Sequence, residues 1–225
     1  MKKKNRLQEF ARYVSLNVMG MIGLSWYILA DTFFVSKGLG TDGLTALNLA
    51  IPIYNFIHGS GLMIGMGGGT RYSIQKSQED HKAANRTFTH TLYLAAVFAV
   101  IFVAVGLLFA GDIVYLFGAR DNVYTMSRTY LRVILLFAPA FLLNNVLLCF
   151  VRNDGAPQLS MAAMIGGSLS NVVLDWVFIF PCGMGIFGAV FATGLAPIIS
   201  MLILSSHFIR RHNGFYPVKC RPQPG

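Results

Sequence analysis

Charge is scarce in this chain, and this scarcity decides its class. Asp, Glu, Lys and Arg make up 12% of the 225 residues, whereas a soluble domain carries about 25%. Residues 43–70 and 91–111 contain none of them. Each run is long enough for the roughly 20 apolar residues of a membrane-spanning helix. With 55% hydrophobic residues and a mean hydropathy of +0.58, the sequence predicts an integral membrane protein and excludes a soluble domain.

Cysteine is also sparse. Cys149, Cys182 and Cys220 are the three present, and they form no CxxC pair and no Cys/His pattern of a zinc site. We therefore expect neither disulfides nor a metal centre built on cysteine, and we expect no prosthetic group.

A phosphate-binding loop is missing as well. The glycine-rich run 59–69 lacks the Gly-Lys-Ser/Thr ending that such a loop needs. Gly61, Gly65 and Gly69 instead repeat every four residues, which places them on one helix face and predicts close helix–helix packing.

The apolar runs predict an all-α fold, a six-transmembrane-helix bundle in one lobe over residues 1–211. The expected spans are residues 13–36, 44–70, 88–111, 129–151, 157–181 and 186–209. Prolines inside the second, fourth and sixth spans each remove a backbone hydrogen bond and favour bending there. Residues 212–225 contain three prolines, and we expect a linker or tail outside the membrane.

The basic residues give the orientation of this multi-pass bundle. With six spans, one side of the membrane holds fourteen of the 18 basic residues: Lys2, Lys3, Lys4, Arg6, Arg12, Arg71, Lys76, Lys82, Arg86, Arg152, Arg210, Arg211, Lys219 and Arg221. Basic loops stay in the cytoplasm during insertion, so both termini are expected there, with the bundle in the cell membrane. The net charge of +9 follows from this arrangement. The basic residues flank apolar spans and cover no soluble face, so the lipid bilayer is the expected partner and nucleic acid is not.

Two acids stand inside expected spans, Asp31 in the first and Asp175 in the fifth. An ionised carboxylate in the bilayer costs a few kcal/mol, and the charge-poor parts of the spans hold no Lys or Arg to neutralise it. Protonation or a bound cation remains as the route to neutrality. Asn171 lies one helical turn before Asp175, and Thr193 supplies a hydroxyl in the sixth span. These four residues offer hard oxygen ligands that suit Na⁺ or a proton relay, and no other metal is expected.

Further polar residues lie within the spans. Each lines a cavity or makes a helix–helix contact, and the sequence leaves both open. These possible cavity-lining residues are Asn48, Asn55, His58, Asn144 and Asn145.

Five segments together resemble the MATE (multidrug and toxic compound extrusion) family, and its MepA-like bacterial members most closely. They match that family in order and spacing through the chain, and comprise residues 30–40, 46–52, 150–157, 171–175 and 184–193. The resemblance implies a secondary transporter, and no enzyme, that expels cationic amphipathic drugs or dyes in antiport with Na⁺ or H⁺. It also implies that Asp31, Asn171, Asp175 and Thr193 form the cation-coupling site of the N-terminal lobe.

The match covers only the first of the two six-helix lobes typical of that family. Alternating access requires one lobe to move against another. A second lobe is therefore expected as partner, either a C-terminal half or another copy of this chain.

Three alternatives stay open. The first is that the chain is an inactive or partner-requiring fragment. The second is that it is a lipid-precursor flippase of the same superfamily, although a flippase cavity needs cationic residues that the spans lack. An intramembrane aspartyl protease using Asp31 and Asp175 would need a GxGD motif, which neither acid has.

Overall fold

The fold is an all-helical bundle in a computed structural model that describes residues 2–209 and 214–218, without the side chains of residues 2–9, 13, 17 and 24. The described part contains seven helices and no strand. They are α1 (Lys2–Ser77), α2 (His81–Leu108), α3 (Ala110–Leu116), α4 (Asp121–Leu136), α5 (Ala138–Asn153), α6 (Pro157–Ile179) and α7 (Gly185–Ile209). All-α architecture is therefore confirmed.

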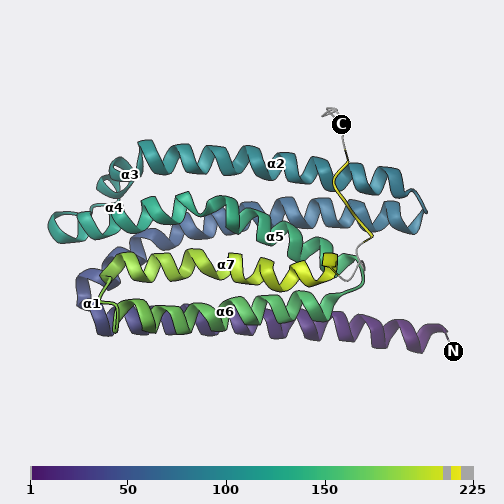
Figure 1. The fold of residues 1–225 in the computed structure, drawn as a ribbon, viewed down its shortest axis with the longest axis horizontal. Coiled ribbons are helices and arrows are strands. Elements are labelled where there is room, and N and C mark those ends of the chain that lie inside the picture. The colour runs from purple at the N-terminus through teal and green to yellow at the C-terminus, as the bar shows by residue number, and fades with distance from the viewer. Residues whose placement is uncertain (1, 210–213, 219–225) are drawn as a thin grey trace.

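Helix α1 contains two of the expected spans and turns back between them. Gly40 has φ 67° and ψ −155° inside it, a conformation that glycine adopts without the steric cost of a β-carbon. Figure 1 shows the first half of α1 running along the bundle and the second half returning in the next layer. The first and second expected spans fall on opposite sides of this reversal.

The remaining spans follow the helices with one interruption. Among the described residues, α1, α2, α6 and α7 are long and apolar enough to cross a membrane. The α4–α5 pair passes the same test together but bends by 47°. Pro139 lies in the first turn of α5, where its missing N–H is tolerated and its ring disfavours a continuous helix. The expected span 129–151 is thus two helices meeting at Phe137, and the count of six spans stays a prediction.

The glycine face of α1 packs closely on α5, as the four-residue repeat predicts. A β-carbon on Gly61 would lie 2.8 Å from Nδ2 of Asn145, and one on Gly65 would lie 2.9 Å from the Asn145 carbonyl oxygen. A β-carbon on Gly69 would lie 2.5 Å from Nδ2 of Asn153. The absence of side chains at these positions lets the two helices approach each other.

One end of the bundle gathers several basic residues. The start of α1, the α1–α2 connection, the α5–α6 connection and the end of α7 all lie there (Figure 1). We call this the basic end, defined by Arg71, Lys76, Lys82, Arg86 and Arg152, which belong to these connections and the helix ends beside them. The arrangement agrees with an even number of crossings.

The expected tail is ordered where it is described. Residues 214–218 form no helix but run along the basic end, and the Phe215 side chain is fully buried. The rest of the tail, with Arg210, Arg211, Lys219 and Arg221, lies outside the described residues, as do the side chains of Lys2, Lys3, Lys4 and Arg6.

Candidate functional site

Two carboxyl groups lie inside the bundle, on helices far apart in the sequence. Asp31 of α1 is 6% exposed and Asp175 of α6 is fully buried. The two groups are near enough to interact electrostatically. Two negative charges in one buried site repel each other, so the pair favours uptake of a proton or a cation.

Asn171 connects Asp175 to α7. Its side-chain amide is oriented with Nδ2 donating to Oδ2 of Asp175 at 3.1 Å and Oδ1 accepting from the Thr193 backbone N–H at 3.2 Å. The reverse orientation leaves only a 3.5 Å contact from Nδ2 to Thr193 Oγ1 and turns the amide oxygen toward the carboxylate. We adopt the first orientation because it satisfies both ends of the amide. The three residues are therefore joined directly.

Tyrosine hydroxyls complete the surroundings. Tyr130 of α4 is buried, hydrogen-bonds the Thr193 side chain and lies within electrostatic range of both aspartates. Tyr27 and Tyr54, from the two halves of α1, hydrogen-bond each other and also interact with Asp31. Sequence reasoning missed these tyrosines, because aromatic residues are common in spans. The one available signal was the four-residue spacing from Tyr27 to Asp31, one helical turn.

The carboxylates keep unused hydrogen-bonding capacity. Oδ1 of Asp31 and Oδ1 of Asp175 are buried without a hydrogen-bond partner among the described residues. An unpaired buried oxygen is costly unless a proton or cation satisfies it. The available donors are carboxylate, amide and hydroxyl oxygens, which suit a hard cation such as Na⁺. The residues present thus fit either a proton or Na⁺.

A cavity of about 260 Å³ adjoins this cluster through Thr193, Tyr27 and Tyr54. Its walls come from both halves of α1 and from α5, α6 and α7. Other lining residues are Met21, His58, Leu62, Met66, Phe141, Asn144, Asn145, Leu148, Arg152, Met164, Gly167, Ser168, Ala196, Pro197 and Ser200. Methionine and aromatic side chains give adaptable apolar walls, and a few polar groups interrupt them.

The five candidate cavity residues divide into two groups. His58, Asn144 and Asn145 line the cavity, and Nδ2 of Asn145 lies 3.2 Å from Nδ1 of His58. Oδ1 of Asn144 is buried and unpaired within the described part of the chain. Asn48 and Asn55 are exposed on the outside of α1 and do not line this cavity.

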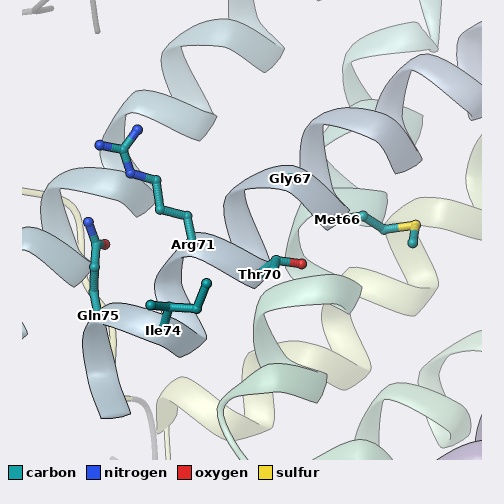
Figure 2. Close-up of a pocket in the computed structure, with 6 residues that line it drawn as sticks. All are labelled: Met66, Gly67, Thr70, Arg71, Ile74 and Gln75. Atoms are coloured by element: carbon teal, nitrogen blue, oxygen red, sulfur yellow. The ribbon is translucent and has the colours of Figure 1, made fainter. Parts of the chain in front are cut away.

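A second hollow, of about 580 Å³, runs along the outside of α1 near its basic end. Figure 2 shows its six lining residues, from Met66 to Gln75, all on this one helix. None of the predicted site residues lies there. We therefore place the candidate site in the carboxylate cluster and the adjoining cavity.

Solved structures of transporters share this fold. The chain superposes on a multidrug resistance MATE family transporter of the MOP superfamily in its outward-facing conformation, with a TM-score of 0.85 and 28% identity, covering 95% of this chain and 48% of that one. A MATE protein in complex with MaD3S gives a TM-score of 0.86 at 28% identity, covering 94% and 49%. A MOP superfamily transporter from Pyrococcus furiosus gives 0.83 at 28% identity, covering 92% and 46%.

Curated relatives agree. The multidrug export protein MepA of Staphylococcus saprophyticus is 27% identical over 185 residues, which cover 82% of this chain and 41% of the relative. MepA of Staphylococcus aureus is 26% identical over 184 residues, with the same coverage. This chain thus spans less than half the length of these relatives.

The family model described as MatE matches residues 18–177. That stretch contains Asp31, Asn171 and Asp175, and it extends over both halves of α1 and on to α6. The chain is therefore a multi-pass membrane protein that belongs to the MatE family of transporters.

Proposed function

We propose that this chain is the cation-coupled lobe of a multidrug efflux antiporter, which exports cationic amphipathic drugs or dyes in exchange for Na⁺ or H⁺. The observation that carries this proposal is the pair of buried carboxyl groups, Asp31 and Asp175, next to a cavity with apolar and aromatic walls. Family membership supports it, because relatives of similar sequence are multidrug export proteins.

Asp31, Asn171, Asp175 and Thr193 form the coupling site. Both carboxylates present an unpaired oxygen, and the Asn171 amide fixes the position of Asp175 against Thr193. Bound Na⁺ or a proton neutralises one of two mutually repelling charges. Loss of that ion leaves the pair charged and unfavourable, which links the ion's presence to the packing of α1 against α6.

In this proposal the adjoining cavity is the drug-binding site of the lobe. A 260 Å³ space accommodates part of a drug-sized molecule, since ligand pockets range from about 300 to 1,000 Å³. Tyr54 and His58 stack at 6.0 Å between ring centroids and offer a flat face to an aromatic cation.

A second six-helix lobe, either a C-terminal half or another copy, completes the transporter. The relatives are about twice as long as this chain, and alternating access moves one lobe against another. Both termini lie in the cytoplasm of the cell in this proposal, since the basic end carries the residues that resist translocation.

The test is gradient-driven transport. The purified chain is reconstituted in liposomes, a Na⁺ or proton gradient is imposed, and uptake of a fluorescent organic cation is followed. Wild type, Asp31→Asn and Asp175→Asn are compared with Asp112→Asn, which changes an exposed acid at the start of α3. We expect gradient-dependent flux that both buried substitutions abolish and the control retains.

A second measurement separates the coupling site from the need for a partner lobe. The thermal unfolding temperature of each variant is measured in detergent while the Na⁺ concentration or the pH is varied. Choline replaces Na⁺ in the control. The proposal requires ion-dependent stabilisation that Asp31→Asn and Asp175→Asn both lose. Absence of flux together with this ion response means that the chain needs its partner lobe. Absence of both overturns the coupling role.

A further inference from the structure

Residues 214–218 lie along the basic end of the bundle. Three of their backbone N–H groups donate hydrogen bonds to side-chain oxygens. The Gly214 N–H donates to Oδ2 of Asp154 at 2.7 Å. The Tyr216 N–H donates to Oδ1 of Asn85 at 3.1 Å, and the Val218 N–H donates to Oγ1 of Thr89 at 3.0 Å. Figure 1 shows this segment passing across α2.

The last two bonds have a matching geometry. Tyr216 and Val218 are two residues apart outside any helix, and an extended chain advances about 6.6 Å over two residues. Asn85 and Thr89 are one turn apart on α2, which advances about 6 Å. The acceptor spacing on the helix therefore fits the donor spacing of an extended segment, and both bonds form together.

Phe215 lies between the Gly214 and Tyr216 donors, and its side chain points into the bundle. Phe215 is fully buried and contacts aromatic rings from four helices. These rings belong to Tyr72, Phe88, Phe150, His207 and Phe208, with centroids 4.7 to 6.4 Å away. Removal of this apolar side chain from water favours its docked position.

Asp154, in the α5–α6 connection, joins the segment to two helices. Its carboxylate is fully buried and pairs with Lys76 of α1. It also accepts a hydrogen bond from the Tyr72 hydroxyl at 2.6 Å and from Nε2 of His207 at 2.9 Å. With the Gly214 N–H, both of its oxygens are satisfied, as a buried carboxylate requires.

We propose that residues 214–218 act as a clasp, fastening α1, α2, α5 and α7 at the basic end and keeping that end of the cavity closed. Phe215 packs on Phe150, and Asp154 follows two residues after Arg152, which lines the cavity. Release of the clasp frees the last turn of α5, which carries Phe150 and Arg152. This inference rests on contacts outside the carboxylate cluster and stands independently of the coupling proposal.

Cys149 provides the probe. It is 2% exposed in the last turn of α5, with its sulfur 3.7 Å from Nη2 of Arg152. In a Cys182→Ser, Cys220→Ser background it is the remaining cysteine, and its rate of reaction with N-ethylmaleimide in liposomes reports opening at this end. We expect slow labelling while the clasp is docked.

The variants are Phe215→Ala and Asp154→Asn, with Tyr216→Ala as matched control. The Tyr216 side chain is 53% exposed and its backbone N–H makes the contact, so its truncation leaves the clasp in place. We expect Phe215→Ala and Asp154→Asn to label at least about tenfold faster, which corresponds to about 1.4 kcal/mol less opening free energy. The control should label as wild type does. Equal labelling rates in all variants would overturn the proposal.

Amide hydrogen exchange of the unmodified chain keeps the proposal testable if a variant does not fold. The amides of Tyr216 and Val218 should exchange at least about tenfold more slowly than in a free peptide of the same sequence, since each is hydrogen-bonded to α2. Exchange at the peptide rate would overturn the clasp. Phe215→Leu, which keeps an apolar side chain, should give intermediate protection at both amides.

Discussion

Asn171 and Asp175 lie one turn apart on α6, and the Asn171 amide donates a hydrogen bond to Oδ2 of the carboxylate at 3.1 Å while its other end accepts from the Thr193 N–H of α7. One side chain thus fixes the position of a buried acid and joins two helices. Removal of this amide leaves an acceptor on Asp175 unsatisfied inside the bundle.

Asn171→Ala should therefore destabilise the protein by about 1–3 kcal/mol, the cost of an unsatisfied buried polar group. Thermal or denaturant unfolding in detergent measures this loss. Ser170→Ala is the neighbouring control, because the Ser170 hydroxyl bonds only the Gly166 carbonyl of its own helix among the described contacts. A loss of stability in Ser170→Ala as large as that in Asn171→Ala would contradict the role assigned to the Asn171 amide.

The contact between α1 and α5 predicts a second result. Gly65→Ala places a β-carbon 2.9 Å from a backbone oxygen and 3.1 Å from the Cα of Val146. Backbone cannot move aside cheaply, so overpacking should cost about 1–3 kcal/mol. The free energy of unfolding measures this effect.

Gly67→Ala is the matched control for that substitution, since no described atom lies within 4 Å of its β-carbon position. It should be neutral or stabilising by up to about 1 kcal/mol, because alanine favours helix over glycine. Equal effects at Gly65 and Gly67 would show that α1 and α5 do not pack as described.

The reversal inside α1 predicts a purely backbone effect. Gly40 has φ 67° and ψ −155°, with no described atom within 4 Å of its β-carbon position, so Gly40→Ala should destabilise by about 1–3 kcal/mol through backbone strain alone. Gly59→Ala also meets open space but without a positive φ, and it should not destabilise. Unfolding curves of the two variants provide the comparison, and a harmless Gly40→Ala would contradict the turn geometry.

Asp154 predicts a pH dependence. Burial by itself raises the pKa of this carboxyl, but hydrogen bonds from Lys76, Tyr72, the Gly214 N–H and His207 outweigh burial and lower the pKa below its usual value. A carboxyl with a lowered folded pKa contributes stability that is fully present above the unfolded pKa, near 4. That contribution is lost as pH falls through the folded pKa.

Unfolding measured between about pH 3 and 7 should show wild type more stable than Asp154→Asn at neutral pH, with the difference shrinking below about pH 4. Asp112→Asn removes an exposed acid and serves as the control. Its free energy of unfolding should stay close to that of wild type across the pH range. A constant gap between wild type and Asp154→Asn across this range would contradict the ionised, hydrogen-bonded state of Asp154.

Much of the candidate site was predictable because charge inside a membrane is exceptional. Asp31 and Asp175 stood out in spans without basic partners, and Asn171 followed from helical spacing. Tyr130 gave no such signal, since its hydroxyl meets Thr193 only after α4 packs against α7. Hydropathy also does not say which side of a helix faces a cavity, so it could not show that Asn48 and Asn55 are exposed on α1.

The sequence by itself determined the helical class, the membrane environment and the clustering of basic residues, because hydropathy and charge act along the chain and need no partner. The four-residue glycine repeat also predicted its close contact correctly. Tertiary structure decided the place of the tyrosines and the docking of Phe215. Each of these depends on contacts between residues distant in the chain, such as Tyr216 with Asn85. Such contacts are set by the packing of whole helices, which no local pattern encodes.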